Sequence, residues 1–162
     1  MSVLNYHFLR ACNFSCKFCF HTALNKRVAK IEDAKDALNK FKNIGIERVN
    51  LSGGEPFFHP KFVGDILTYA KSINMKTSVI SNGSLLNEKW FEKYGNILDV
   101  LGISCDSFNL DIQQKIGRIS KNGNQVDLTK INELTDETDL KGELACAGGA
   151  CEITESTAIA AG

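Results

Sequence analysis

The chain has 162 residues, of which 43% are apolar and 23% charged, and these values fit one modest globular domain with a hydrophobic core. Its 19 Lys and Arg residues balance 19 Asp and Glu residues, which excludes a general electrostatic attraction to nucleic acid or to anionic membranes. The sequence has no apolar run of about 20 residues and no secretory leader pattern. We therefore expect a cytoplasmic protein whose six cysteines are metal ligands or free thiols.

Predicted strands and helices alternate along the first 120 residues. The strands are expected at Val3 to Leu9, Arg48 to Ser52, Thr77 to Ser81 and Val100 to Ser104, and the helices at Ile31 to Ile44, Phe62 to Ile73, Leu86 to Tyr94 and residues 109–117. This order indicates an α/β fold with a parallel sheet and helical crossovers. A complete β/α barrel has eight such units in about 250 residues. We therefore predict a partial (β/α) barrel, truncated after about four units.

The composition changes near residue 121. Residues 1–121 carry the regular pattern and form one predicted domain. Residues 122–162 are polar and then rich in Ala and Gly, without clear periodicity. We expect them to form a separate tail, and we assign no role to Cys146 and Cys151 within it.

Three cysteines, Cys12, Cys16 and Cys19, fall in one loop after the first predicted strand. Thiolates are soft ligands that suit iron–sulfur clusters and zinc. Three of them leave one iron of a [4Fe–4S] cluster without a protein ligand, and a chelating cofactor or substrate needs such an open position. Two alternatives remain, a structural zinc site completed by His21 and a group of buried thiols without a metal.

The spacing C-x₃-C-x₂-C, with Phe18 before the last cysteine, resembles the signature of radical S-adenosylmethionine (SAM) enzymes. The resemblance extends to the viperin family through Asn5 to Phe8, Arg10, Asn13, Phe18 to Thr22, Trp90-Phe91, Tyr94-Gly95, Leu98-Asp99 and Ile103 to Phe108. It covers about residues 3 to 120. It implies a [4Fe–4S] cluster on Cys12, Cys16 and Cys19, with SAM as the second cofactor and Phe20 among the SAM-binding residues.

The segment Ser52 to Pro56 follows the second predicted strand. Its two glycines let the backbone approach a ligand closely, and Glu55 offers a carboxylate to a cationic group. A plain strand-to-helix turn is the alternative interpretation. The segment also resembles the GGE motif of radical SAM enzymes, which implies that Gly53, Gly54 and Glu55 bind the methionyl amine of SAM.

Polar residues also follow the third and fourth predicted strands. Ser81 and Asn82 are by themselves a turn signal. The resemblance implies that they hold the ribose and carboxylate of SAM, together with Ser104 and Arg118. A carboxylate needs a cation, and Arg can bind it with two hydrogen bonds. The alternative for Arg118 is a solvated surface residue.

Three residues of the second predicted strand are candidates for substrate binding. The resemblance implies that Asn50 faces a nucleotide, with Ser52 beside it. Arg48 stands where the family commonly carries lysine, a difference that keeps the charge but changes the donor geometry. Core positions are predicted at Phe62, Leu67, Trp90 and Leu98, with Cys105 as a buried thiol.

The resemblance implies an enzyme without a catalytic side chain beyond its cofactors. The reduced cluster would cleave SAM to a 5′-deoxyadenosyl radical, which converts CTP to 3′-deoxy-3′,4′-didehydro-CTP for antiviral defence. The implied partners are the nucleotide and a reductant such as flavodoxin or ferredoxin, with no nucleic acid and no membrane. The alternatives are a radical SAM enzyme for another nucleotide or a peptide, and an inactive fragment that binds a cluster or zinc. We expect this chain alone not to convert CTP efficiently.

Overall fold

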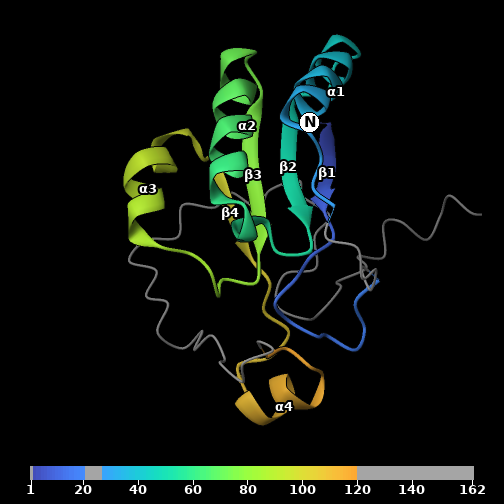
Figure 1. Cartoon of the computed structure of the whole chain (residues 1–162), viewed down its shortest axis with the longest axis vertical. Helices are drawn as coiled ribbons and strands as arrows, with labels where there is room; N and C mark the ends of the chain where they lie inside the picture. Colours follow the sequence, from blue (N-terminus) through green and yellow to red (C-terminus); the bar gives the residue numbers. More distant parts are fainter. Residues whose placement is uncertain (1, 21–26, 120–162) are drawn as a thin grey trace, which may run out of the picture. The chain divides into compact units, whose positions relative to one another are not determined.

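The computed structural model describes residues 2–20 and 27–119. Four parallel strands form one sheet in the order β1-β2-β3-β4 (Figure 1). The strands are β1 Val3–Leu9, β2 Arg48–Gly53, β3 Lys76–Ser81 and β4 Val100–Ile103. The α-helices are α1 Ile31–Asn43, α2 Pro60–Ser72, α3 Glu88–Tyr94 and α4 Leu110–Lys115, and short 3₁₀ helices lie at η1 Pro56–Phe58 and η2 Gly95–Ile97. The predicted α/β fold, a partial (β/α) barrel, is confirmed.

The predicted elements all occur, and most of their ends lie within one or two residues of the predicted positions. Two helix starts differ for identifiable reasons. Helix α2 begins at Pro60 because the fixed φ of proline suits the first helical position. Helix α3 begins at Glu88 because Asn87 caps it, its side-chain oxygen accepting a hydrogen bond from the Trp90 N–H at 3.0 Å.

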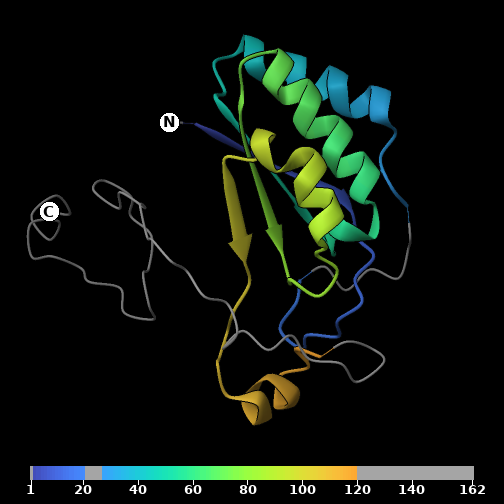
Figure 2. The same cartoon turned by 90° about the vertical axis from the view of Figure 1, so that its left-hand side faces the viewer.

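Helices α1, α2 and α3 cover one face of the sheet (Figure 2). Side chains alternate along a strand, so Val49 and Leu51 of β2 point into this core and are fully buried. Each such apolar side chain stabilises the fold by about 1.5–3 kcal/mol relative to an exposed one. The predicted core is confirmed: Leu67 and Trp90 are buried, and Phe62 and Leu98 are partly buried and pack against the cluster.

Cys105 is exposed, so the prediction of a buried thiol is wrong. Cys105 lies two residues after the end of β4, the last strand of the described sheet. Its side chain therefore lies outside the core between the sheet and the helices.

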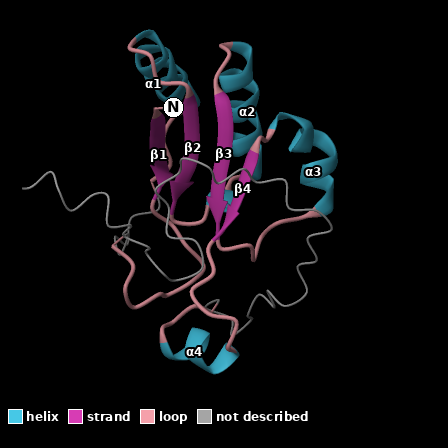
Figure 3. Ribbon diagram, turned by 180° about the vertical axis from the view of Figure 1, so that it is seen from behind, coloured by secondary structure: helices cyan, strands magenta, loops and turns pink. Residues whose placement is uncertain are grey.

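The opposite face of the sheet is turned toward the viewer in Figure 3, and it carries a row of polar side chains on its first three strands. Asn5, Asn50 and Ser78 occupy matching positions on β1, β2 and β3. Asn50 Nδ2 donates to Asn5 Oδ1 at 2.8 Å, and Ser78 Oγ donates to Asn50 Oδ1 at 3.0 Å. Polar side chains are costly to bury without hydrogen-bond partners, so a row of them is typical of a sheet face that contacts water or a polar ligand.

Two further predictions concern the chain's surroundings and its tail. Among residues 2–20 and 27–119, no helix combines the length and the apolar character that crossing a membrane requires. The predicted tail, residues 122–162, lies outside the described residues, as does His21.

Candidate cofactor site at the carboxyl ends of the strands

The three predicted cluster cysteines lie in the loop that follows β1, and each is half-buried. The Phe14 N–H points at Cys12 Sγ at 3.4 Å, and the Cys19 N–H donates to the Cys16 carbonyl oxygen at 3.2 Å. These contacts fold the segment into a compact turn, so its thiols come from one short, ordered stretch of backbone.

The segment after α4 packs against this loop. The Lys17 N–H donates to the Ile116 carbonyl oxygen at 2.9 Å. Gly117 has a φ of +78°, and a Cβ there would lie 2.3 Å from the Ser15 carbonyl oxygen. Only glycine fits both the backbone conformation and the space. The backbones of Gly117 and Ser15 therefore pack directly against each other, although the two residues are far apart in the sequence.

Two side-chain donors point at cysteine sulfurs. Asn82 Nδ2 lies 3.8 Å from Cys12 Sγ, and Arg118 Nη1 lies 3.8 Å from Cys16 Sγ. Arg118 Nε is 2.6 Å from Asp106 Oδ2, an ion pair without the alignment of a hydrogen bond. Burial raises the pKa of the Cys12 and Cys16 thiols, and the Arg118 charge acts against this at Cys16. Donors of this kind favour a sulfur that carries negative charge.

The glycine pair after β2 packs against the start of the cysteine loop. Gly53 has a φ of +137°, and a Cβ there would lie 2.3 Å from the Leu9 carbonyl oxygen. At Gly54 a Cβ would lie 1.9 Å from the Ala11 carbonyl oxygen. The Gly54 N–H donates to Leu9 at 3.1 Å, and the Glu55 N–H to Ala11 at 2.8 Å. The glycines are thus required by a close approach of two backbone segments, whatever ligand they also meet.

Glu55 is fully buried, and its carboxylate is satisfied within the protein. Oε1 accepts hydrogen bonds from the Phe57 N–H at 3.0 Å and from Ser81 Oγ at 2.8 Å, while Oε2 accepts one from the Asn82 N–H at 2.8 Å. Burial raises the pKa of Glu55, and these three donors act in the opposite direction. The carboxylate therefore joins the loop after β2 to the end of β3.

The comparisons with known proteins decide the family. A profile described as the Radical SAM superfamily matches residues 6–131. The chain belongs to the Radical SAM superfamily. It is 48% identical over 137 residues to an S-adenosylmethionine-dependent nucleotide dehydratase RSAD2 of Oncorhynchus mykiss, a match that covers 82% of this chain and 39% of the relative. It is 51% identical over 121 residues to the protein of the same name from Danio rerio, covering 72% and 34%. It is 31% identical to an S-adenosylmethionine-dependent nucleotide dehydratase of a Thermoplasmatales archaeon, covering 86% and 50%.

The chain thus spans about half the length, or less, of these curated relatives. Among solved structures it resembles Streptococcus suis SuiB bound to its precursor peptide SuiA, with a TM-score of 0.60 at 21% identity over 75% of this chain and 28% of that one. It also resembles methylornithine synthase, with a TM-score of 0.58 at 16% identity over 71% and 36%. These distant likenesses establish the radical SAM fold.

Membership of the Radical SAM superfamily implies a [4Fe–4S] cluster and SAM, and SuiB has also been solved with S-adenosylmethionine bound. Within the described part of the chain, no three His, Cys, Asp or Glu side chains gather as ligands of a single ion. A cubane spreads three cysteine ligands over three irons, so its thiolates need not converge on one point. Three thiols in one loop, two of them facing N–H donors, fit such a cluster.

The structure brings several of the other predicted radical SAM residues to the same edge of the sheet. Ser81 is the last residue of β3 and Asn82 follows it, and the Ser104 N–H donates to the Ser81 carbonyl oxygen at 2.9 Å. Phe20 is 84% exposed, and its ring centroid lies 6.2 Å from that of His7. Arg48 stands at the first position of β2, at the opposite end of the strand from Gly53.

Asn13 and Ser84 also belong to this site, although the sequence analysis assigned neither a role in it. Asn13 Nδ2 donates to Ser84 Oγ at 2.7 Å across 71 residues of sequence. The available signals were that Asn13 follows the first cysteine within the family-like string and that Ser84 belongs to a turn after β3. Neither signal says that the two side chains meet, because the pairing depends on the tertiary fold.

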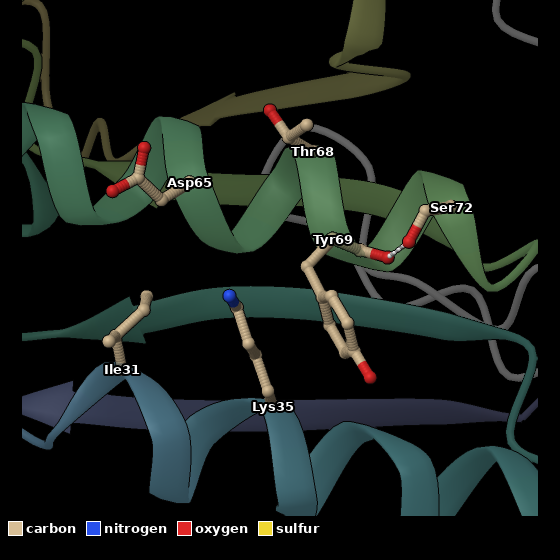
Figure 4. Close-up of a pocket in the computed structure, with 6 residues that line it drawn as sticks. All are labelled: Ile31, Lys35, Asp65, Thr68, Tyr69 and Ser72. Atoms are coloured by element: carbon tan, nitrogen blue, oxygen red, sulfur yellow. Dashed lines mark hydrogen bonds between the residues drawn. The ribbon is translucent and has the colours of Figure 1, made fainter.

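A hollow of about 410 Å³ lies away from this edge, between α1 and α2 (Figure 4). Its lining consists of Ile31, Lys35, Asp65, Thr68, Tyr69 and Ser72. Lys35 Nζ lies 5.3 Å from the centre of the Tyr69 ring, a cation–π contact across the two helices. The hollow belongs to the helical layer and contains none of the predicted cofactor or substrate residues.

Proposed function

We propose that this chain holds a [4Fe–4S] cluster on Cys12, Cys16 and Cys19 and forms the cofactor-binding part of a nucleotide dehydratase. One observation carries the proposal. Asn82, at the end of β3, hydrogen-bonds through its backbone N–H to Glu55 after β2 and directs its side-chain amide at Cys12 in the cysteine loop. The names of the relatives support the nucleotide as substrate. When bound and reduced, the cluster supplies the electron that cleaves SAM.

We assign SAM binding to residues around the same edge of the sheet. Glu55 contributes by fixing the backbone after β2, since its carboxylate oxygens already accept three hydrogen bonds. Arg118 is the candidate cation for the SAM carboxylate, although Asp106 and Cys16 also engage it. The proposed SAM set is Phe20, Gly53, Gly54, Glu55, Ser81, Asn82, Ser104 and Arg118.

The polar face of the sheet supports a nucleotide as the substrate. Asn50 and Ser52 project from β2 on this face, and alternation along the strand places Arg48 on it too. Arg48 Nε is buried and has no hydrogen-bond partner among the described residues. A buried donor without a partner costs free energy unless a ligand supplies an acceptor. We assign Arg48, Asn50 and Ser52 to a nucleoside triphosphate, with CTP as the substrate and the didehydro nucleotide as the product.

The remaining parts of the proposal follow from the chemistry. A one-electron reduction of the cluster requires a donor such as flavodoxin or ferredoxin. The antiviral role of the product and the cytoplasmic location stay predictions. The likeness to SuiB bound to a precursor peptide is at 21% identity and supports the fold alone, so it does not favour a peptide substrate for this chain.

The test is anaerobic reconstitution of the 162-residue chain with iron and sulfide. We expect about four irons and four sulfides per chain, and loss of the cluster in Cys12→Ala, Cys16→Ala and Cys19→Ala. The reduced protein with SAM and a panel of nucleoside triphosphates should form 5′-deoxyadenosine, most of it with CTP, while little of the didehydro nucleotide is expected from this chain alone. Purification with one tightly held zinc, released in His21→Ala, would instead support a structural metal site.

A further inference from the structure

A closed ring of three hydrogen bonds joins the cysteine loop to the turn after β3. Asn82 Nδ2 donates to Asn13 Oδ1 at 2.9 Å, Asn13 Nδ2 donates to Ser84 Oγ at 2.7 Å, and Ser84 Oγ donates to Asn82 Oδ1 at 2.5 Å. Each side chain donates once and accepts once within the ring. Asn13 is the residue next to Cys12, whereas its two partners come about 70 positions later. The ring therefore connects the residue next to Cys12, a proposed cluster ligand, to the turn after β3.

The ring fixes the orientation of the Asn82 amide. Asn82 is 7% exposed, and its Oδ1 also accepts a hydrogen bond from the Ser84 N–H at 2.9 Å. Its Nδ2 has two hydrogens, one used by Asn13 and the other directed at Cys12 Sγ, 3.8 Å away. A reversed amide would set Oδ1 against two acceptors, Asn13 Oδ1 and the sulfur. It would also turn the NH₂ group toward the donor at Ser84, so the observed orientation is strongly preferred.

We infer that Asn13 is a positioning residue, which aims the Asn82 N–H at the Cys12 thiolate and thereby raises the reduction potential of the cluster. The inference rests on the proposed cluster site. A cluster becomes more negative when it is reduced, so a hydrogen bond to a ligand sulfur stabilises the reduced form more than the oxidised one. Asn13 hydrogen-bonds to Asn82, and Asn82 faces the Cys12 sulfur, so the effect of Asn13 passes through Asn82.

The donor at Cys16 allows this effect to be distinguished from a general change in the cysteine loop. Arg118 reaches Cys16 from the segment after α4, and none of its contacts involves the ring. Loss of the ring should therefore weaken the donor at Cys12 and leave the donor at Cys16 in place. A cluster should still form, with an altered potential.

The experiment compares four forms of the reconstituted 162-residue chain, without SAM, by redox titration followed by electron paramagnetic resonance. They are the unaltered protein, Asn13→Ala, Asn82→Ala and the double variant. We expect full iron and sulfide content and a more negative potential in both single variants. Because Asn13 acts through Asn82, the double variant should match Asn82→Ala rather than show the sum of two shifts. Asn39→Ala is the matched control, since it removes a comparable amide contact, the hydrogen bond from the Tyr69 hydroxyl, on the helical layer.

Ser84→Ala breaks the ring without altering the cysteine loop, and it replaces Asn13→Ala if that variant does not fold. It should also shift the potential to more negative values. An unchanged potential in a fully loaded Asn13→Ala or Ser84→Ala protein would overturn the inference alone, as would additive shifts in the double variant. If the unaltered chain takes up no iron and sulfide, the proposed function fails and the inference fails with it.

Discussion

Glu55 and Asn82 are 27 residues apart in the sequence, yet Glu55 Oε2 lies 2.8 Å from the Asn82 backbone nitrogen. The same Asn82 directs its side-chain amide at Cys12. The carboxylate of Glu55 thus fixes the backbone of the residue that faces Cys12, the proposed cluster ligand. Glu55 is therefore part of the frame of the proposed cofactor site.

The first prediction is that Glu55→Gln lowers the free energy of unfolding by about 1–3 kcal/mol, because one buried donor loses its acceptor. The glutamine oxygen can replace Oε1, but the NH₂ group then faces the Asn82 N–H. Urea unfolding of the protein without cofactors measures the effect. Glu92→Gln, at an exposed position of α3, is the control and should change little. Equal stability of the two variants would contradict the role of Glu55.

The second prediction concerns the contact between Gly54 and Ala11. In Gly54→Ala the added Cβ would lie 1.9 Å from the Ala11 carbonyl oxygen, so one of two backbone segments must move. We expect a loss of about 1–3 kcal/mol or more in unfolding free energy. In Gly95→Ala the nearest atom is Phe91 Cβ at 3.8 Å, and the backbone is right-handed helical. That control should be neutral or slightly stabilising, and a similar result for both variants would refute the steric argument.

The third prediction is a pH dependence that arises at Asp99. Burial acts to raise the pKa of Asp99, but hydrogen bonds from Lys71 and Thr77 and the Lys71 charge outweigh it and lower that pKa. A carboxyl whose pKa is lower in the folded state stabilises the fold at pH values above its unfolded pKa, about 3.9 for Asp. This contribution is lost as the pH falls through the folded pKa.

Stability measured from pH 6 to pH 2.5 should therefore fall less steeply in Asp99→Asn than in the unaltered chain. Asp65→Asn is the matched control, because Asp65 pairs with Lys61 within one helix at the surface. Such pairs contribute little. Parallel curves for Asp99→Asn and the unaltered protein would show that the contacts of Asp99 do not carry the dependence.

The sequence predicted the elements of this fold well, because its signals are local. The alternation of Val49 and Leu51 with Asn50 marks β2 as a strand with one apolar and one polar face, and Gly53-Gly54 marks its end. The cysteine spacing similarly predicted that three thiols lie in one loop, as they do after β1. These patterns are read within about ten residues and need no knowledge of the tertiary structure.

The sequence could not supply the partners across the fold. From the sequence, the glycine pair indicates either a close approach to a ligand or a plain turn, and the structure adds that the Leu9 and Ala11 carbonyl oxygens lie closest. From the sequence, Glu55 offers a carboxylate to a cationic group, and the structure adds that three donors of the protein hydrogen-bond to its oxygens. Such contacts join residues far apart in sequence, and no local pattern encodes them.

The last prediction uses Arg48, the one substrate candidate with a buried donor that lacks a partner among the described residues. Arg48 Nε is shielded from water but makes no hydrogen bond there. Replacing it by methionine removes this donor and keeps much of the apolar stem, so we expect the unliganded protein to gain about 1 kcal/mol. The same change should weaken binding of a nucleoside triphosphate, because a cation for the phosphates is lost.

Arg48→Met should thus raise the stability and lower the affinity for the nucleotide. A residue with a purely structural role would instead lower the stability when replaced. Urea unfolding measures the first effect, and calorimetric titration with CTP and with cytidine measures the second. The affinity for CTP should fall in Arg48→Met while that for cytidine stays similar, since only CTP carries phosphates. Arg48→Lys keeps the charge and should retain part of the preference for CTP. A destabilised Arg48→Met protein with unchanged CTP affinity would show that Arg48 supports the strand and not the nucleotide.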